Sequence, residues 1–414
     1  MIYYPLNLRG LMDNNYEIGI IGSGVAGMMA ATTISDKTDG KKVIVFDLGR
    51  KWFKRRAQMF AFAGLLPNSD GKYYLNDLDE VKKVIPEKEV NTAFDKLNKL
   101  YNEFIDFKFT SSNIPSKNKI NNLKQNAYNY KLNDFVQLYP KQIHNLMKGI
   151  VTKLEDHEDI DFSFDNEVLC ITKTDEGFLL NTEYGDFNCK KLLVCVGRSG
   201  WRWCSEFFNH IGIVDTDTNV KYGAYIDISS KNLSNYNNSA ITLYKNNITA
   251  GPFLWNGSII PEDHVDMAIC SFRSNENRWK SDKVTIPLMC EISHKDGYEE
   301  IDRIAKLTFI LTNDRICRER ISTLMSGKSK VSVLKEFDII KDAMKDLSNV
   351  VDDLLESGSF SVPAIVPLPP KVKLGTNLET EIPGLYLAGE SAGISGLLAA
   401  SVMGIIAGEN LIGK

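Results

Sequence analysis

The stretch Tyr16-Glu-Ile-Gly-Ile-Ile-Gly22-Ser-Gly24-Val-Ala-Gly27 decides the fold. Its first half is a short apolar run, which is typical of a strand buried in a parallel sheet. The glycines lead into a helix that we predict over residues 28–34, a segment of small and apolar side chains. A polar turn then precedes Val43–Asp47, a second apolar strand that ends in an acid. Strand, helix and strand within roughly 30 residues predict a parallel crossover unit.

The glycines of this stretch follow the pattern Gly-x-Gly-x-x-Gly between a strand and a helix, which is the context that a bound dinucleotide requires. Gly22 permits the tight turn, Gly24 lets the backbone approach a pyrophosphate, and Gly27 lets the helix pack closely on the sheet. The amides at the amino end of the helix would bind the diphosphate. Asp47 follows about 20 residues later, where it can accept hydrogen bonds from a ribose diol. An acid at this place favours a dinucleotide whose ribose has a free 2′-hydroxyl, which is the case for FAD and NAD.

A similar order of strand, glycines and helix recurs near the C-terminus, in Pro383-Gly-Leu-Tyr-Leu-Ala-Gly-Glu390-Ser-Ala-Gly393-Ile-Ser-Gly396. A nicotinamide dinucleotide seldom needs protein from both ends of a chain. FAD is longer, so a second strand end can hold its ribityl and pyrophosphate region. The last helix would then point its amino end at the pyrimidine edge of the flavin, where a partial positive charge stabilises the reduced ring. The two patterns together favour FAD.

With these motifs the sequence resembles FAD-dependent oxidoreductases of the glutathione-reductase-type two-dinucleotide-binding superfamily, and more narrowly the branch labelled FAD-dependent dehydrogenases. The stretches that carry the resemblance span most of the chain: 22–27 with Asp47, 64–72, 192–200 and 383–396. The resemblance implies that the acid after the Ala-Gly pair, here Glu390, contacts the ribityl chain or pyrophosphate, although relatives often have Asp. It also implies that the strand backbone at Val168 binds the adenine.

The expected FAD ligands therefore come from both ends of the chain and from its middle. They are Gly22, Ser23, Gly24, Val25, Ala26, Gly27, Asp47, Leu48, Gly49, Arg56, Lys72, Val168, Gly197, Gly389, Glu390, Gly396 and Leu397. The middle of the chain contains no second Gly-x-Gly-x-x-Gly, and its seven cysteines form no Cys-x-x-Cys. Both absences argue against a pyridine-nucleotide–disulfide oxidoreductase.

The tetrapeptide Ser69-Asp70-Gly71-Lys72 allows two interpretations. Gly71 permits a sharp turn, and Lys72 near N5 or N1 of a flavin would stabilise negative charge on the reduced ring. Alternatively the four residues form a surface β-turn, because Asn, Ser, Asp and Gly favour turns by themselves. The residues alone do not choose between the two, and the resemblance favours contact with the flavin.

Four basic residues follow the second strand: Lys51, Lys54, Arg55 and Arg56. Arg55 or Arg56 could reach the cofactor phosphates, or the cluster could bind an anionic substrate or a polynucleotide. A solvated helix face is the ordinary fate of such a run.

The region expected to bind substrate offers only weak candidates for catalysis. His264 could act as a general base and Arg273 as a carboxylate clamp, but a structural role is the more common one for such isolated residues. Lys72 is a third weak candidate. Trp201 and Trp203 could roof a substrate pocket, although core packing is the default for tryptophan. Cys195 lies within an apolar strand, and we expect it to be structural.

The length of 414 residues predicts two or three domains. We expect an α/β protein with three parts. A Rossmann-like FAD-binding domain with a parallel sheet would be assembled from residues 1–80, 140–205 and 370–414. A helical insertion would span 81–139, and a mixed α+β substrate domain would span 206–369.

Local patterns predict further elements inside these parts. Strands are expected at 168–172, 178–181, 191–196, 222–228, 267–272 and 307–311, and helix within 335–355. Pro363, Pro367, Pro369 and Pro370 cannot extend a helix or a central strand, so they predict a boundary.

Composition limits the class of protein. The formal net charge of −4 leaves no domain-wide positive field for nucleic acid, although a local basic patch remains open. The apolar stretches at 18–31 and 396–408 are shorter than the ~20 residues of a membrane helix or are interrupted by glycines. Unpaired, thinly spread cysteines suit the cytoplasm, and we expect no membrane association and no metal site.

These observations predict a cytoplasmic FAD-dependent oxidoreductase, a dehydrogenase or oxidase, that transfers a hydride between a small organic substrate and flavin N5. The identity of the substrate and of the electron donor or acceptor stays open. Two other functions also stay open: a flavoprotein that modifies a nucleic-acid base or its adduct, and a non-catalytic flavin-binding module.

Overall fold

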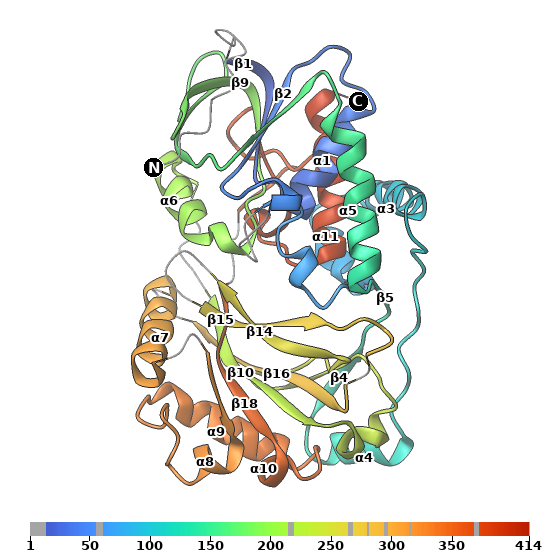
Figure 1. The fold of residues 1–414 in the computed structure, drawn as a ribbon, viewed down its shortest axis with the longest axis vertical. Coiled ribbons are helices and arrows are strands. Elements are labelled where there is room, and N and C mark those ends of the chain that lie inside the picture. The colour runs from blue at the N-terminus through green and yellow to red at the C-terminus, as the bar shows by residue number, and fades with distance from the viewer. Residues whose placement is uncertain are drawn as a thin grey trace.

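Two β-sheets, one above the other in Figure 1, organise the chain. The computed structural model describes residues 14–54, 61–213, 219–263, 268–279, 281–293, 297–313, 316–367 and 372–413. The first sheet collects strands from the N-terminal half and one strand from near the C-terminus. The second sheet is built mainly from the region between them.

The first sheet has the order β6-β2-β1-β9-β8-β7, and β19 pairs with β9. Its strands are β1 (Asn15–Ile21), β2 (Val43–Asp47), β6 (Ile160–Phe164), β7 (Val168–Lys173), β8 (Phe178–Thr182), β9 (Gly185–Val194) and β19 (Leu385–Leu387). The pairs β6–β2, β2–β1, β1–β9 and β9–β19 are parallel. In this register the carboxyl ends of β1, β2, β9 and β19 meet at one edge of the sheet. The parallel sheet confirms the predicted α/β class and its Rossmann-like half.

Helices α1 (Val25–Ser35) and α11 (Leu397–Ile412) lie side by side in the upper half of Figure 1, blue beside red. They are parallel, because Gly404 of α11 lies against Ala26 and Gly408 lies against Ala30. A Cβ on Gly404 would be 2.3 Å from the Ala26 carbonyl oxygen, so the two backbones approach closely. This packing brings the amino ends of the first and last helices to the same edge of the sheet.

Longer helices of this half also flank these two or the sheet: α3 (Glu87–Asn102), α5 (Pro140–Glu155) and α6 (Trp201–Ile211). Short 3₁₀ turns are η1 (Trp52–Lys54), η2 (Leu66–Asn68), η3 (Leu75–Asp77), η4 (Arg198–Gly200) and η6 (Gly389–Ala392). The small strands β3 (Lys72–Tyr74) and β5 (Phe135–Gln137) pair with each other.

The second sheet has the order β17-β18-β10-β16-β12-β11-β4, and β13 pairs with β16. Its members are β4 (Asn129–Leu132), β10 (Asn219–Ser229), β11 (Ile241–Lys245), β12 (Ile248–Ala250), β13 (Leu254–Trp255), β16 (Lys283–Ser293), β17 (Cys317–Arg320) and β18 (Ser359–Pro367). A hairpin of β14 (Gly257–Asp263) and β15 (Ala268–Ser274) lies toward the first half. The helical elements of the second half are α4 (Lys117–Gln125), η5 (Ser230–Tyr236), α7 (Gly297–Thr312), α8 (Ile321–Met325), α9 (Glu336–Leu347) and α10 (Leu354–Ser357).

The prediction of a strand at 307–311 was wrong, because these residues form the end of α7. The apolar run Leu307-Thr-Phe-Ile-Leu311 looks like a strand by itself. However, the buried positions are Ile304, Ala305 and Thr308, which have helical spacing, while Phe309 and Ile310 are exposed. The helical spacing becomes visible only when the preceding turns of α7 are read together with residues 307–311.

The prediction that the prolines exclude a central strand was also wrong. Pro363 and Pro367 belong to β18, which lies between β17 and β10. The ladder between β18 and β10 shifts register between Gly223 and Tyr225, and Pro363 has no partner on β10. The missing amide of Pro363 therefore breaks no ladder bond. Pro369 and Pro370 lie outside the described residues.

The segment 81–139 differs from a purely helical insertion. It contains α3 and α4, and also β4 at the edge of the second sheet and β5 beside β3. The short helix α2 (Leu78–Val81) begins just before it. Because α3 packs on α11 while β4 pairs with β11, this segment connects the two halves of the molecule.

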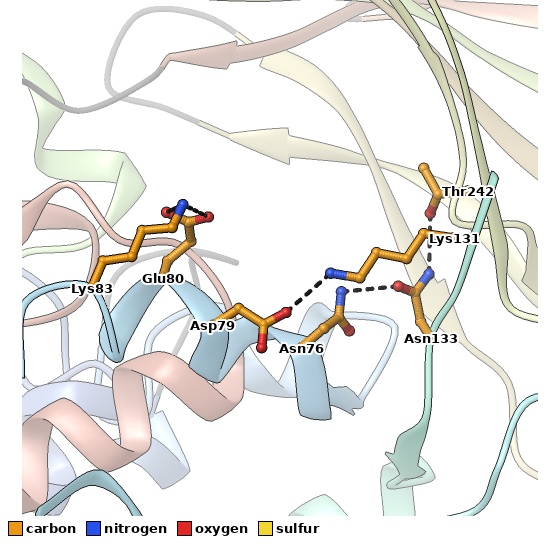
Figure 2. A network of polar contacts seen from close by, with 7 residues as sticks. All are labelled: Asn76, Asp79, Glu80, Lys83, Lys131, Asn133 and Thr242. Atoms are coloured by element: carbon orange, nitrogen blue, oxygen red, sulfur yellow. Dashed lines mark hydrogen bonds and ion pairs between the residues drawn. The ribbon is translucent and has the colours of Figure 1, made fainter. Parts of the chain in front are cut away.

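A polar network fixes η3 and α2 to the second sheet (Figure 2). Asn76 Nδ2 donates to Asn133 Oδ1 over 3.0 Å, and Asn133 Nδ2 donates to Thr242 Oγ1 over 3.1 Å. The same amide nitrogen donates to the Ala240 carbonyl over 2.8 Å. Asn133 is buried, so these bonds are shielded from water.

Replacing Asn133 with alanine is expected to lower the free energy of unfolding by about 1–3 kcal/mol, because buried polar partners would lose their bonds. Urea denaturation measures the change. The matched control is Lys131→Met, which removes an exposed ion pair with Asp79 from the same strand region and should cost less than about 1 kcal/mol. If the two changes lower the free energy of unfolding equally, the hydrogen bonds of Asn133 do not contribute to stability beyond an exposed ion pair.

Candidate functional site

A cavity of about 750 Å³ lies where the parallel strands of the first sheet end. Its walls include the loops after β1, β2, β9 and β19, and residues of β10 and β16 from the second sheet. In open α/β sheets, ligands bind at the carboxyl ends of the strands. The position of the cavity therefore makes it the candidate site.

The glycine loop between β1 and α1 forms one wall. Gly22 has φ +97°, a conformation that favours glycine. A Cβ on Gly27 would lie 1.9 Å from the Gly22 carbonyl oxygen, so Gly27 is needed for the packing of the helix on the loop. A Cβ on Gly24 would meet no protein atom within 4 Å. Gly24 lines the cavity, and the space in front of it is open to a ligand that approaches the amino end of α1.

Asp47 lines the cavity and also braces the glycine loop. Its Oδ2 accepts hydrogen bonds from the Ser23 amide over 2.9 Å and the Ser23 hydroxyl over 2.6 Å. Its Oδ1 accepts a bond of 2.7 Å from the Gly49 amide. A carboxylate has about four acceptor positions, so capacity remains for a ribose hydroxyl. The bracing role was not predicted from the sequence.

Val168 lies at the start of β7, at another side of the cavity. Its carbonyl oxygen accepts a 2.7 Å hydrogen bond from the Trp203 indole nitrogen. Trp201 and Trp203 both line the cavity, so these rings are wall residues as well as packed ones. Cys195 is buried, and its thiol donates to the Ile21 and Gly22 carbonyl oxygens, a structural arrangement.

The C-terminal motif contributes Gly389, Glu390, Gly396 and Leu397 to the same cavity. Glu390 forms an ion pair of 3.5 Å with Arg198, a residue whose role the sequence analysis did not anticipate. Burial alone would lower the pKa of Arg198, but the charges of Glu390 and Glu262 outweigh it, so this pKa lies above its ordinary value. The Nε atom of Arg198 is buried without a hydrogen-bond partner. Such an unsatisfied donor beside a cavity fits an anionic or carbonyl-bearing ligand.

Asp70, Lys72 and Tyr74 form a polar cluster on the cavity wall. The Lys72 amide donates to Asp70 Oδ1 over 3.0 Å, and the Tyr74 hydroxyl donates to Asp70 Oδ2 over 3.1 Å. Burial lowers the pKa of Lys72, and the charge of Asp70 opposes part of that shift. Burial likewise raises the pKa of Asp70, against the opposing charge of Lys72.

The tetrapeptide 69–72 is indeed a turn, with Gly71 at φ +66° and its amide bonded to the Ser69 hydroxyl. The alternative of a surface turn is wrong, however, because Ser69 and Lys72 are buried. A Cβ on Gly71 would lie 2.0 Å from the Leu138 carbonyl oxygen, so the turn is packed against a neighbouring segment. Turn geometry and a lysine that lines the cavity are therefore combined in the same four residues.

The other predicted site residues divide into those that line the cavity and those that do not. Ser23, Gly27 and Gly49 are near the wall but do not line the cavity, and Val25, Ala26, Leu48 and Gly197 do line it. Arg273 is exposed on β15 and is not a lining residue. His264, Arg55 and Arg56 lie outside the described residues, whereas Lys51 and Lys54 are exposed.

The amino end of α11 carries a side chain from a distant segment. Asp77, the last residue of η3, accepts a hydrogen bond from the Leu398 amide and lines the cavity with Gly396 and Leu397. Sequence analysis missed Asp77 because no local motif contains it. Its position depends on the packing of η3 against α11.

Comparison with known proteins gave one family match. The model described as "Glucose inhibited division protein A" (GIDA) matches residues 367–414, the segment with β19, η6 and α11. No curated protein matches the chain.

The fold was also compared with solved structures. A glycine oxidase from Geobacillus kaustophilus is 13% identical with a TM-score of 0.48, over 96% of this chain and 94% of that chain. GidA from Aquifex aeolicus is 13% identical with a TM-score of 0.46, over 97% and 64%. L-amino acid deaminase from Proteus vulgaris is 11% identical with a TM-score of 0.43, over 98% and 94%. At these TM-scores the similarities carry no weight for the activity of this chain.

The family match falls on the C-terminal segment that sequence analysis assigned to FAD. Together with the Rossmann-like fold it supports the prediction of an FAD-dependent oxidoreductase with FAD as its cofactor. Among the residues that the structure describes, every helix is too short or too polar to cross a membrane.

Proposed function

We propose that this protein transfers a hydride between a small organic substrate and FAD bound in the cavity. The observation that supports this most is the meeting of two distant motifs at one site. Gly24 at the amino end of α1 and Gly396 at the amino end of α11 line the same cavity, which continues to residues of the second sheet. Two helix ends suit a long, doubly charged dinucleotide, and the second half leaves room for a substrate.

The residues present fit FAD. The open space at Gly24 would take the diphosphate, Asp47 the adenosine ribose, and the backbone of Val168 the adenine. Glu390 and its partner Arg198 would hold the ribityl and pyrophosphate region. When bound, FAD supplies a hydride acceptor or donor at its N5 atom.

The substrate would lie between the Lys72 cluster and the second half of the molecule. There the wall is apolar, with Leu254, Phe272 and Met289 among its residues. An apolar wall with few polar groups is typical of sites for small organic molecules. The Nζ atom of Lys72 can take a proton from an amine or alcohol of the substrate, because burial lowers the pKa of this lysine and favours its neutral form.

The test begins with the visible spectrum of the purified protein supplied with FAD, followed by anaerobic mixing with amines, amino acids, alcohols and NAD(P)H. We expect flavin absorbance that at least one of these compounds bleaches. A protein that stays colourless with excess FAD would refute the proposed site. Flavin that binds but is bleached by none of them would favour a non-catalytic flavin-binding module.

Replacing Lys72 with methionine is expected to slow the bleaching about 100-fold or more, with FAD affinity changed only a few-fold. In the wild type the rate should rise with pH and level off below the ordinary lysine pKa of 10.5, because the lysine must be neutral to accept a proton. The variant should lose this rise. Stopped-flow absorbance measures both, and Lys99→Met, an exposed lysine on α3, is the control. An unchanged pH profile in the Lys72 variant would exclude it as the base.

A further inference from the structure

The amino end of α11 is capped by a residue from another part of the chain. Its N-cap residue, Gly396, has no side chain and adopts φ +117°. A Cβ at Gly396 would lie 2.3 Å from Asp77 Oδ2. The Asp77 carboxyl group therefore occupies the place beside the helix end and takes the hydrogen bond of the Leu398 amide.

The charge state of Asp77 matters because its Oδ2 atom is buried without a hydrogen-bond partner. A buried carboxylate oxygen without a partner is costly, and a proton on it removes most of that cost. The cation that acts on Asp77 is Lys131, which forms its ion pair with Asp79. The other charged group that faces Asp77 from the cavity wall is Asp70, whose negative charge also disfavours an ionised Asp77.

These contacts act together on the carboxyl group. Burial raises the pKa of Asp77 to about 8, with Asp70 and Asp79 acting in the same direction and the Leu398 amide and Lys131 against it. Asp77 would thus be protonated at neutral pH and ionised in mild alkali. The network of Asn76 and Asn133 in Figure 2 holds the neighbouring residue, so Asp77 is fixed in place.

We propose that Asp77 holds a proton at the amino end of α11 and thereby sets the reduction potential of the flavin at this site. This inference rests on the proposed function, since it places FAD in the cavity. A neutral Asp77 leaves the partial positive charge of the helix end available to the reduced ring. An ionised Asp77 cancels that charge and adds repulsion, so reduction becomes less favourable. The sequence alone indicated a helix end that always favours reduction, whereas the capped end favours it only while Asp77 keeps its proton.

The test is Asp77→Asn, which keeps the shape and the acceptor for Leu398 but stays neutral at every pH. Spectroelectrochemistry gives the midpoint potential of the bound flavin from pH 6 to pH 10. We expect the two proteins to agree near pH 6. Above about pH 8 the wild-type potential should fall below that of the variant, by up to tenfold in the reduction equilibrium per pH unit, or about 30 mV for two electrons, and the difference should become constant once Asp77 is ionised in the reduced protein as well. Asp95→Asn removes an exposed acid of α3 that is not among the charges acting on Asp77, so this control should follow the wild type.

A second measurement does not need the cofactor. Because the folded pKa of Asp77 lies above its unfolded value of 3.8, its contribution to stability is complete at low pH and is lost as pH rises through about 8. The urea midpoint of the FAD-free wild type should therefore fall relative to Asp77→Asn from about pH 4 to about pH 8 and stay level above that. If the midpoint potentials of the wild type and Asp77→Asn change with pH in the same way, and their urea midpoints do too, the proposed role of Asp77 is overturned. A failure of both proteins to bind FAD would instead refute the proposed function, and the urea comparison would still decide whether Asp77 carries the proton.

Discussion

Replacing Gly24 with glutamate is expected to abolish FAD binding while the protein still folds. Gly24 has φ −61°, which any residue can adopt, and a Cβ there would meet no protein atom within 4 Å. A glutamate side chain therefore has room, and that room is the part of the cavity in front of the α1 amides. Its carboxylate would occupy the anion position and repel the diphosphate.

The dissociation constant for FAD, titrated by flavin fluorescence, should rise by at least about 100-fold, or ~3 kcal/mol. The midpoint of urea denaturation without FAD should stay within about 1 kcal/mol of the wild type. Asn91→Glu adds the same charge at an exposed position of α3 and should leave both quantities unchanged. Wild-type affinity in the Gly24 variant would mean that the dinucleotide does not pass over this loop.

The first crossover unit could be predicted from sequence almost residue by residue. The strand expected at 16–22 is β1 (Asn15–Ile21), the helix expected at 28–34 lies within α1, and the second strand is β2 as predicted. Each of these elements has a local signal: an apolar run, the glycine spacing, or an acid at the end of a strand. Local signals suffice when the element is buried on nearly all sides.

Elements whose partners come from distant segments were harder to predict. Pro363 is acceptable in β18 only because the register of β10 shifts beside it, and nothing near Pro363 in the sequence shows that shift. The strand-like run at 307–311 belongs to a helix because its preceding turns pack against the second sheet. In both cases tertiary packing overrides a local preference.

The site was predicted where a motif carries its residues and missed where only the fold brings them together. The two glycine motifs meet at one cavity, as the sequence suggested. Arg198 is significant because it reaches Glu390 from another loop, and Asp77 because η3 packs at the amino end of α11. Neither contact has a fixed spacing along the chain, so a single sequence contains no pattern for it.

Replacing Gly404 with leucine should have the largest effect on stability. Gly404 and Gly408 let α11 lie directly on α1, and a Cβ at Gly404 would be 2.3 Å from the Ala26 carbonyl oxygen and 2.9 Å from Met29 Cβ. A leucine would force the helices apart, at a cost of about 3 kcal/mol or more in the free energy of unfolding. Separation of the helices would also move their amino ends, which both line the cavity.

The smaller change Gly404→Ala makes the prediction sharp, because the leucine variant risks misfolding. Within an ordinary helix, alanine in place of glycine stabilises by about 1 kcal/mol. Here the backbone contact reverses the sign, so we expect a lower urea midpoint and weaker FAD binding, with leucine worse than alanine. Asn91→Ala, on the exposed face of α3, should be neutral or slightly stabilising. A Gly404→Ala protein that is more stable than the wild type and binds FAD as tightly would show that the close approach of α1 and α11 does not hold the two motifs together.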